Sequence, residues 1–124
     1  MKYGICVTVA ACSLFCVPAF GRNDVSFAKD IQPMLHDYCV SCHAPGGKGY
    51  AASGLDLRSY EGLMAGTKFG PVIKPGDSLG STLITLIQGQ GHPAVNMPYD
   101  IKGTLSKRKI AILKQWVNQG ARNN

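Results

Sequence analysis

The stretch Cys39-Val40-Ser41-Cys42-His43 decides how the rest of this sequence is interpreted. It places two thiols three residues apart and an imidazole directly after the second thiol. The chain has 124 residues and five Cys. The other three, Cys6, Cys12 and Cys16, all lie in an uncharged N-terminal stretch from Tyr3 to Phe20. If that stretch is removed, the motif holds every remaining thiol and no disulfide framework can form.

The N-terminal stretch has the form of a secretory signal. Lys2 precedes the apolar run, and small residues stand at Ala19 and Gly21, where cleavage would occur. We therefore expect residues 1–21 to be a signal peptide and residues 22–124 to form one exported, periplasmic domain. The apolar run is close to the shortest length that crosses a bilayer, roughly 17 residues, so retention of residues 3–20 as a membrane anchor is the alternative.

The charge of the predicted mature chain is moderately basic. From residue 22 onward there are 12 Lys and Arg against 7 Asp and Glu, and Lys107-Arg108-Lys109 is the one cluster. A nucleic-acid-binding surface more often has a stripe of such clusters with interleaved aromatic residues, so we expect no nucleic-acid partner. We interpret the charge mainly as an aid to solubility, with a second role in docking to the acidic surface of a partner.

Apolar residues recur at helical spacing in four parts of the mature chain, and no segment alternates as a strand would. The sequence therefore predicts an all-α fold with short helices and long loops. Loops of this length are uncommon in a compact domain unless they have a function. A large apolar cofactor would supply the missing core. The predicted helices run from a cap at Ser26 to Cys39, split at Pro33; from Ser59 to Ala65; from a cap at Ser78 or Ser81 to Gly89; and from a cap at Ser106 to Gly120, with loops over 44–54, 69–77 and 90–104.

The two thiols of the motif can each add to one vinyl group of a haem, with the adjacent imidazole under the iron. The C-x-x-C-H run is the sequence sign of this covalent attachment. A structural zinc site needs four nitrogen or sulfur ligands, and an iron–sulfur cluster needs four thiolates. A thioredoxin-like pair would lie in a βαβ context that this sequence lacks. The motif therefore predicts one covalently bound haem c, attached through Cys39 and Cys42 and ligated by His43.

Several segments outside the motif resemble those of the small class I cytochromes c, and most closely the short cytochrome c modules of planctomycete bacteria. The resemblance covers Val25 to Arg122. It implies a class I cytochrome c fold, in which three to five short helices and long loops wrap around one haem, and the first and last helices pack together. It also implies that His43 and a loop Met bind opposite faces of the iron. The segments are Phe27–Leu35, Gly54–Leu57, Lys74–Asp77 with Ser81 and Leu83, Met97-Pro98, and Trp116–Ala121.

Five residues could supply the sixth iron ligand. Met34 and His36 lie on the helix that leads into the motif, from which the opposite face is hard to reach. Met64 falls on an apolar stripe, where a Met is more often core filler. Met97 lies in a polar, Pro-rich loop, and its soft thioether suits haem iron. We predict Met97, with His92 of the same loop or an open or water-bound site as the alternatives.

Two further expectations follow from the resemblance to class I cytochromes. The second ring nitrogen of His43 needs an acceptor that fixes the ring. In that family a Pro carbonyl in a Gly-Pro loop has this role, which Gly70-Pro71 resembles, although any carbonyl from Phe69 to Pro75 could serve. Side chains that could neutralise or hydrogen-bond the haem propionates are Arg58, Lys74, Tyr60 and Trp116.

Ligation by both His43 and Met97 would saturate the iron, so the expected chemistry is outer-sphere transfer of one electron. We expect a carrier between redox partner proteins, such as an oxidase, a dehydrogenase or another cytochrome, and not an enzyme, because the mature chain shows no acid–base pair or nucleophile constellation. The alternatives are a haem-based ligand sensor or small catalyst, which needs an open site, and a haem subunit of a larger membrane-bound oxidoreductase complex.

Overall fold

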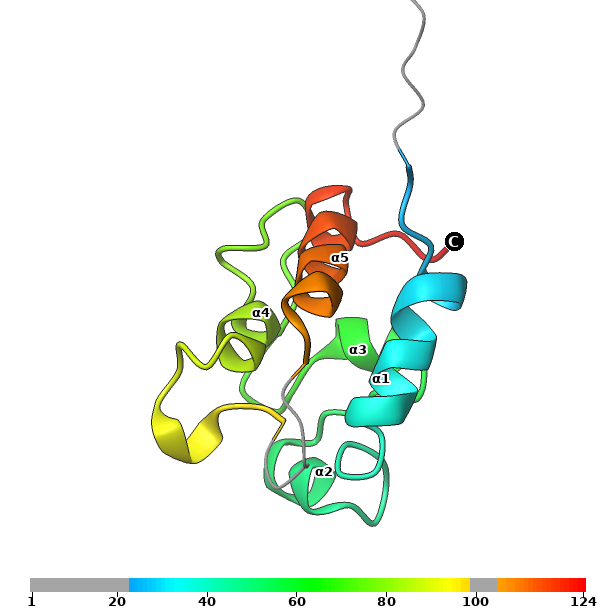
Figure 1. Ribbon diagram of the computed structural model, residues 1–124. Coiled ribbons are helices and arrows are strands. Elements are labelled where there is room, and N and C mark those ends of the chain that lie inside the picture. The colour runs from blue at the N-terminus through cyan, green and yellow to red at the C-terminus, as the bar shows by residue number, and fades with distance from the viewer. Residues whose placement is uncertain (1–22, 99–104) are drawn as a thin grey trace, which may run out of the picture.

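The computed structural model describes residues 23–98 and 105–124, which form short helices joined by loops (Figure 1). Over these two ranges the one extended pairing is an isolated bridge between Thr67 and Gly70, in agreement with the predicted all-α class. The predicted signal peptide, residues 1–21, lies outside the described residues, and so do residues 99–104 of the expected 90–104 loop. Among the helices described, none has the length and apolarity needed to cross a membrane.

The first predicted helix is present and divided as expected. A π-helical turn, η1 (Phe27–Ile31), leads into α1 (Gln32–Tyr38). The Ser26 hydroxyl caps this unit by accepting a hydrogen bond from the Lys29 N–H at 3.2 Å. Pro33 stands in the first turn of α1, where a missing N–H costs no helical hydrogen bond. The change of helix type therefore occurs at the predicted place, with α1 starting one residue before Pro33.

Three more predicted helices are confirmed: α3 (Tyr60–Ala65), α4 (Thr82–Ile87) and α5 (Lys107–Asn118). Ser106 caps α5 with its hydroxyl, as expected, and Ser59, which was predicted as the first residue of a helix, caps α3 in the same way. Ser81 is the N-cap residue of α4, but its hydroxyl makes no capping bond. It is fully buried and instead accepts from the Lys74 N–H and donates to the Asp77 carbonyl, which holds the preceding loop on the core.

The expectation of a loop over 44–54 is wrong, because α2 (Lys48–Ser53) lies inside it. Its Tyr50 N–H donates to the Cys42 carbonyl at 2.9 Å. Within the helix, the Ser53 hydroxyl donates to the Gly49 carbonyl at 2.7 Å. The expected 90–104 loop also contains a single 3₁₀ turn, η2 (Pro93–Val95). The small residues of α2 do not predict a helix. It is supported by contacts with the haem motif, which cannot be read from composition.

The core lies where α5 packs against η1 and α4. Three aromatic rings meet there: the Phe27 centroid is 5.2 Å from that of Tyr60 and 5.6 Å from that of Trp116. Trp116 is almost fully buried, and its Nε1–H donates to the Arg122 carbonyl at 2.9 Å. The first and last helical segments are therefore in contact, as the resemblance implied.

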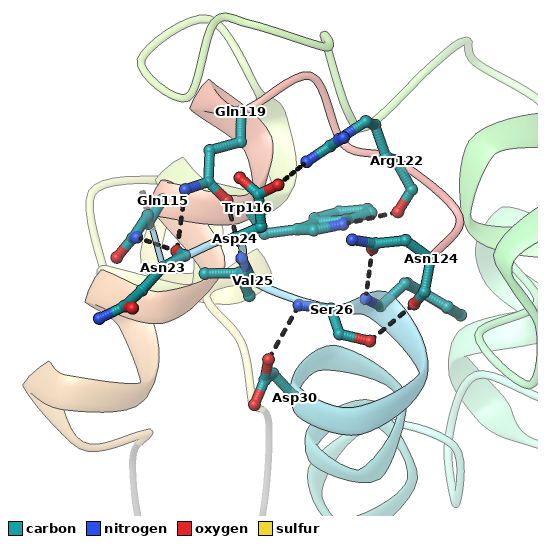
Figure 2. A network of polar contacts seen from close by, with 11 residues as sticks. Asn23, Asp24, Val25, Ser26, Asp30, Gln115, Trp116, Gln119, Arg122 and Asn124 are labelled. Atoms are coloured by element: carbon teal, nitrogen blue, oxygen red, sulfur yellow. Dashed lines mark hydrogen bonds and ion pairs between the residues drawn. The ribbon is translucent and has the colours of Figure 1, made fainter. Parts of the chain in front are cut away.

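Polar contacts join the two ends of the domain beside this core (Figure 2). The Gln119 side chain accepts from the Val25 N–H at 2.9 Å and donates to the Asn23 carbonyl at 3.2 Å. Asn124 accepts hydrogen bonds from three donors at the start of η1: the hydroxyl of Ser26 and the N–H groups of Phe27 and Ala28. These bonds fix the start of the first helix to the last residues of the chain.

Candidate cofactor site

A mostly apolar cavity of about 600 Å³ lies at the end of the molecule where α1, α2 and η2 meet. Cys39, Cys42, His43 and Met97, the four residues predicted to hold the cofactor, all line it. Met97 lies more than fifty positions after the two Cys and His43 in the sequence. The fold therefore brings both parts of the predicted ligand set to one place. Apolar lining is supplied by Leu57, Leu83, Ile87, Val95, Pro98 and Leu105.

The two thiols are presented by the tight turn that follows α1. Cys39 is the C-cap of that helix, and the N–H groups of Cys42 and His43 both donate to its carbonyl, at 3.1 and 2.9 Å. Both Cys are free, with no disulfide between them. Burial, assisted by the charge of Cys42, raises the pKa of Cys39 to about 11. Its sulfur is therefore a protonated thiol at neutral pH.

His43 is buried, and its Nδ1 has no hydrogen-bond partner. Burial lowers its pKa, and the Leu55 backbone acts in the opposite direction. A backbone acceptor favours the protonated ring, but no carbonyl forms a hydrogen bond with Nδ1. The imidazole is thus neutral, the state that a metal ligand requires.

The expectation that the Gly70-Pro71 loop orients His43 is not supported by this structure. The His43 Nδ1 has no hydrogen-bond partner, so neither the Pro71 carbonyl nor another carbonyl of residues 69–75 reaches it. The backbone group that acts on the pKa of the ring is that of Leu55, and the nearby Leu57 N–H donates to the His43 carbonyl at 2.8 Å. This pairing follows from the path of the chain after α2, a helix that the sequence did not predict.

Met97 is half-buried in the cavity wall, and its N–H donates to the Leu86 carbonyl at 3.1 Å. The four rival ligands line no part of this cavity. Met34 and Met64 belong to the core or pack against it. His36 is exposed beside Asp37. His92 points its Nδ1 at the Ala94 N–H, from which it accepts a hydrogen bond at 3.2 Å.

The four residues expected near the propionates also lie away from the cavity lining. The Arg58 guanidinium is paired with Asp56 at 2.7 Å, and the Tyr60 hydroxyl donates to the Ala121 carbonyl at 2.9 Å. Trp116 is part of the core, as described above.

The polar group found at the rim instead is Tyr38, whose hydroxyl accepts from the Lys109 Nζ at 2.6 Å. Lys109 stands where a capping box would have an acid, which was the one sequence signal for this pair.

The residues present fit a haem. The cavity offers two free thiols, a neutral imidazole and a thioether among apolar side chains, which is the donor set of covalently attached haem. The wall formed by α2 and the turn before it is built from small residues, among them Gly46, Gly47, Gly49 and Ala52, so a flat ring system can approach the backbone. Among the described residues, no cluster of three His, Cys, Asp or Glu side chains competes as a metal site.

Comparison with known proteins agrees with this site. The family model of planctomycete cytochrome C matches residues 39–99, a range that begins at the first thiol of the motif and ends just after Met97-Pro98. Searches of curated proteins and of solved structures returned no match. The family match implies a covalently bound haem, for which Cys39 and Cys42 are the candidate attachment residues, and a haem-based redox role. Residues 39–99 match the planctomycete cytochrome c family, as the resemblance predicted.

Proposed function

We propose that the protein is a monohaem c-type cytochrome that carries single electrons between redox partner proteins by outer-sphere transfer. The observation that supports this proposal is the meeting of His43 and Met97 in one cavity with both thiols. The rival ligands Met64 and His92 do not line that cavity. A nitrogen and a sulfur ligand together complete the axial coordination of haem iron, as in the electron-carrying cytochromes c.

When bound, the haem supplies an iron that exchanges one electron between its ferric and ferrous states. Cys39 and Cys42 would fix the group to the end of α1, and the His43 Nε2 and Met97 sulfur would serve as ligands. The thioether favours the reduced state, which raises the midpoint potential. Leu57, Leu83 and the other apolar side chains of the lining exclude water, which tunes the potential further. We propose a carrier and not an enzyme, because two strong ligands leave no position for a substrate.

We further propose that acidic surfaces of periplasmic redox proteins dock near the cavity. Lys48 lines the cavity, and the Tyr38–Lys109 pair stands at its rim. Lys107 and Arg108 are exposed in the same first turn of α5 as Lys109. A cluster of positive charge beside an electron-transfer site speeds encounter with a negatively charged partner, and salt weakens the effect.

The proposal is tested on protein exported by a host competent in cytochrome maturation. We expect a haem that stays with the chain on a denaturing gel and a ferric spectrum with the weak far-red band of Met-ligated iron. The ferrous form should resist carbon monoxide, since both axial positions are taken. Rapid carbon monoxide binding would instead support the ligand sensor, and extraction only by detergent would support the membrane-bound subunit. Colourless protein with two titratable thiols would reject a haem protein altogether.

A further inference from the structure

Gly49 occupies the second position of α2, a helix of six residues. Glycine is, after proline, the residue least suited to a helix interior. The backbone gives no reason for it: Gly46 and Gly54, on either side of α2, have positive φ angles, but Gly49 does not. A residue with a side chain could adopt the same backbone conformation and would favour the helix. The reason for a glycine must therefore lie in its surroundings.

The surroundings are the imidazole of His43 and, slightly farther away, the Cys42 carbonyl oxygen, which would lie 3.0 Å from a Cβ on Gly49. A Cβ placed on Gly49 would lie 2.7 Å from the His43 Cε1 and 2.8 Å from its Nε2, closer than real Cβ contacts. These two atoms form the edge of the ring remote from the backbone, and Nε2 is the iron ligand in the proposed function. Gly49 and His43 both line the cavity. A side chain at Gly49 would thus meet the ring at its ligating atom.

The backbone of both partners is held in place. The Tyr50 N–H holds α2 to the Cys42 carbonyl at 2.9 Å, and a Cβ on Gly47 would collide with that carbonyl. On the other side, the Leu57 N–H holds the His43 carbonyl at 2.8 Å. Because Nδ1 has no hydrogen-bond partner, no strong polar contact fixes the rotation of the ring. The rotation of the ring is therefore set by its packing against Gly49.

We propose that Gly49 is the positioning residue for His43: its lack of a side chain keeps Nε2 open to the cavity, and its backbone sets the orientation of the ring. The inference rests on the proposed function, because it concerns how His43 is presented to haem iron. It assigns to α2 a role in the iron site that the C-x-x-C-H motif alone does not contain.

Substitution at Gly49 tests the proposal in the haem-loaded protein. We expect Gly49→Ala to keep the covalently attached haem, lose part of the low-spin ferric absorption and shift the midpoint potential. Gly49→Val should do both to a greater extent. Ala51→Gly and Ala51→Val are matched controls, because Ala51 is exposed on the same helix. They change helix propensity and side-chain size without touching His43, and should leave both readouts unchanged. An unaltered spectrum and potential in Gly49→Ala would overturn the proposal.

A second measurement needs no substitution. In the reduced, low-spin wild-type protein, proton NMR should show a nuclear Overhauser effect between the Gly49 α protons and the His43 ring proton on Cε1. Its absence would overturn the proposal even if the variants fail to accumulate. Either negative result, obtained on protein with attached haem and the far-red band, refutes the role of Gly49 alone. Wild-type protein without haem would refute the proposed function instead.

Discussion

Met97 is held in the cavity wall by its own backbone and by a neighbouring side chain. Its N–H is bonded to the Leu86 carbonyl, and the preceding Asn96 accepts from the Gly91 N–H at 3.0 Å. Two hydrogen bonds therefore hold this segment, one to Leu86 in α4 and one to Gly91 in the loop that follows α4. A thioether presented by an anchored backbone loses little freedom on binding a metal, which favours its use as a ligand.

We expect Met97→Ala to abolish the far-red ferric band and to lower the midpoint potential by on the order of 0.1 V, while haem stays attached through Cys39 and Cys42. The physical reason is loss of the sulfur ligand that favours ferrous iron. Absorption spectra and a redox titration measure both effects. Met64→Ala is the matched control and should retain the band, because Met64 packs against the core. Survival of the band in Met97→Ala would mean that His43 is paired with another ligand.

The raised pKa of Cys39 predicts slow alkylation in the folded chain that has no haem. The thiolate is the reactive form, so the rate at Cys39 should rise about tenfold per pH unit from neutral pH toward 11. In urea the burial that raises the pKa is lost, and the rate at neutral pH should increase on the order of a hundredfold. Iodoacetamide labelling followed by peptide mass spectrometry distinguishes Cys39 from Cys42. Equal rates in native and urea-treated chain would contradict the assignment.

At the scale of helices, local signals were sufficient where a side chain caps its own helix. Ser26 and Ser106 were identified in this way because a hydroxyl three residues before a free N–H is a feature of the sequence itself. Helix α2 was missed because bonds to the Cys42 carbonyl and contact with His43 hold it, and its small residues carry no periodic pattern.

The cap of α5 gives a prediction about stability. Ser106→Ala should lower the free energy of unfolding by about 1 kcal/mol, because the Lys109 N–H loses its acceptor. In a domain of this size, that loss corresponds to a fall of roughly 4–8 °C in the melting temperature. Thermal unfolding followed by circular dichroism measures it. Ser106→Asp, which keeps a capping oxygen, should melt near the wild-type temperature, and an equal fall in both variants would mean that the hydroxyl is not acting as a cap.

Over the whole molecule, the contacts between residues 23–26 and the C-terminal residues lie at the opposite end of the core from α2, whose residues line the cavity (Figure 1). The sequence predicted the all-α class and the four residues that line the cavity, because these depend on composition, on a short motif and on the type of side chain in one loop. The pairing of the two chain ends could not be predicted in this way. It depends on contacts between Gln119 and Asn23, and between Asn124 and Ser26, that are more than ninety residues apart.

This separation predicts that stability and redox properties change independently. Gln119→Ala removes the acceptor of the Val25 N–H and the donor to the Asn23 carbonyl, which together should cost about 1–3 kcal/mol of unfolding free energy. The midpoint potential and the ferric spectrum should stay as in the wild type. Gln119→Glu keeps the acceptor and should lose less stability. A shifted potential in Gln119→Ala would show that the two ends are coupled through the core.

The direction in which residue 23 leaves the domain has a practical consequence. Asn23 is bonded to α5 at the end of the molecule remote from α2 and the cavity (Figure 1). A linker attached ahead of this residue would emerge on the side away from the redox centre. Protein immobilised on an electrode through such a linker would present the mouth of the cavity to solution. Current would then be carried mainly by partner proteins that diffuse to the cavity. Direct electron transfer between the electrode and the haem iron would be slower.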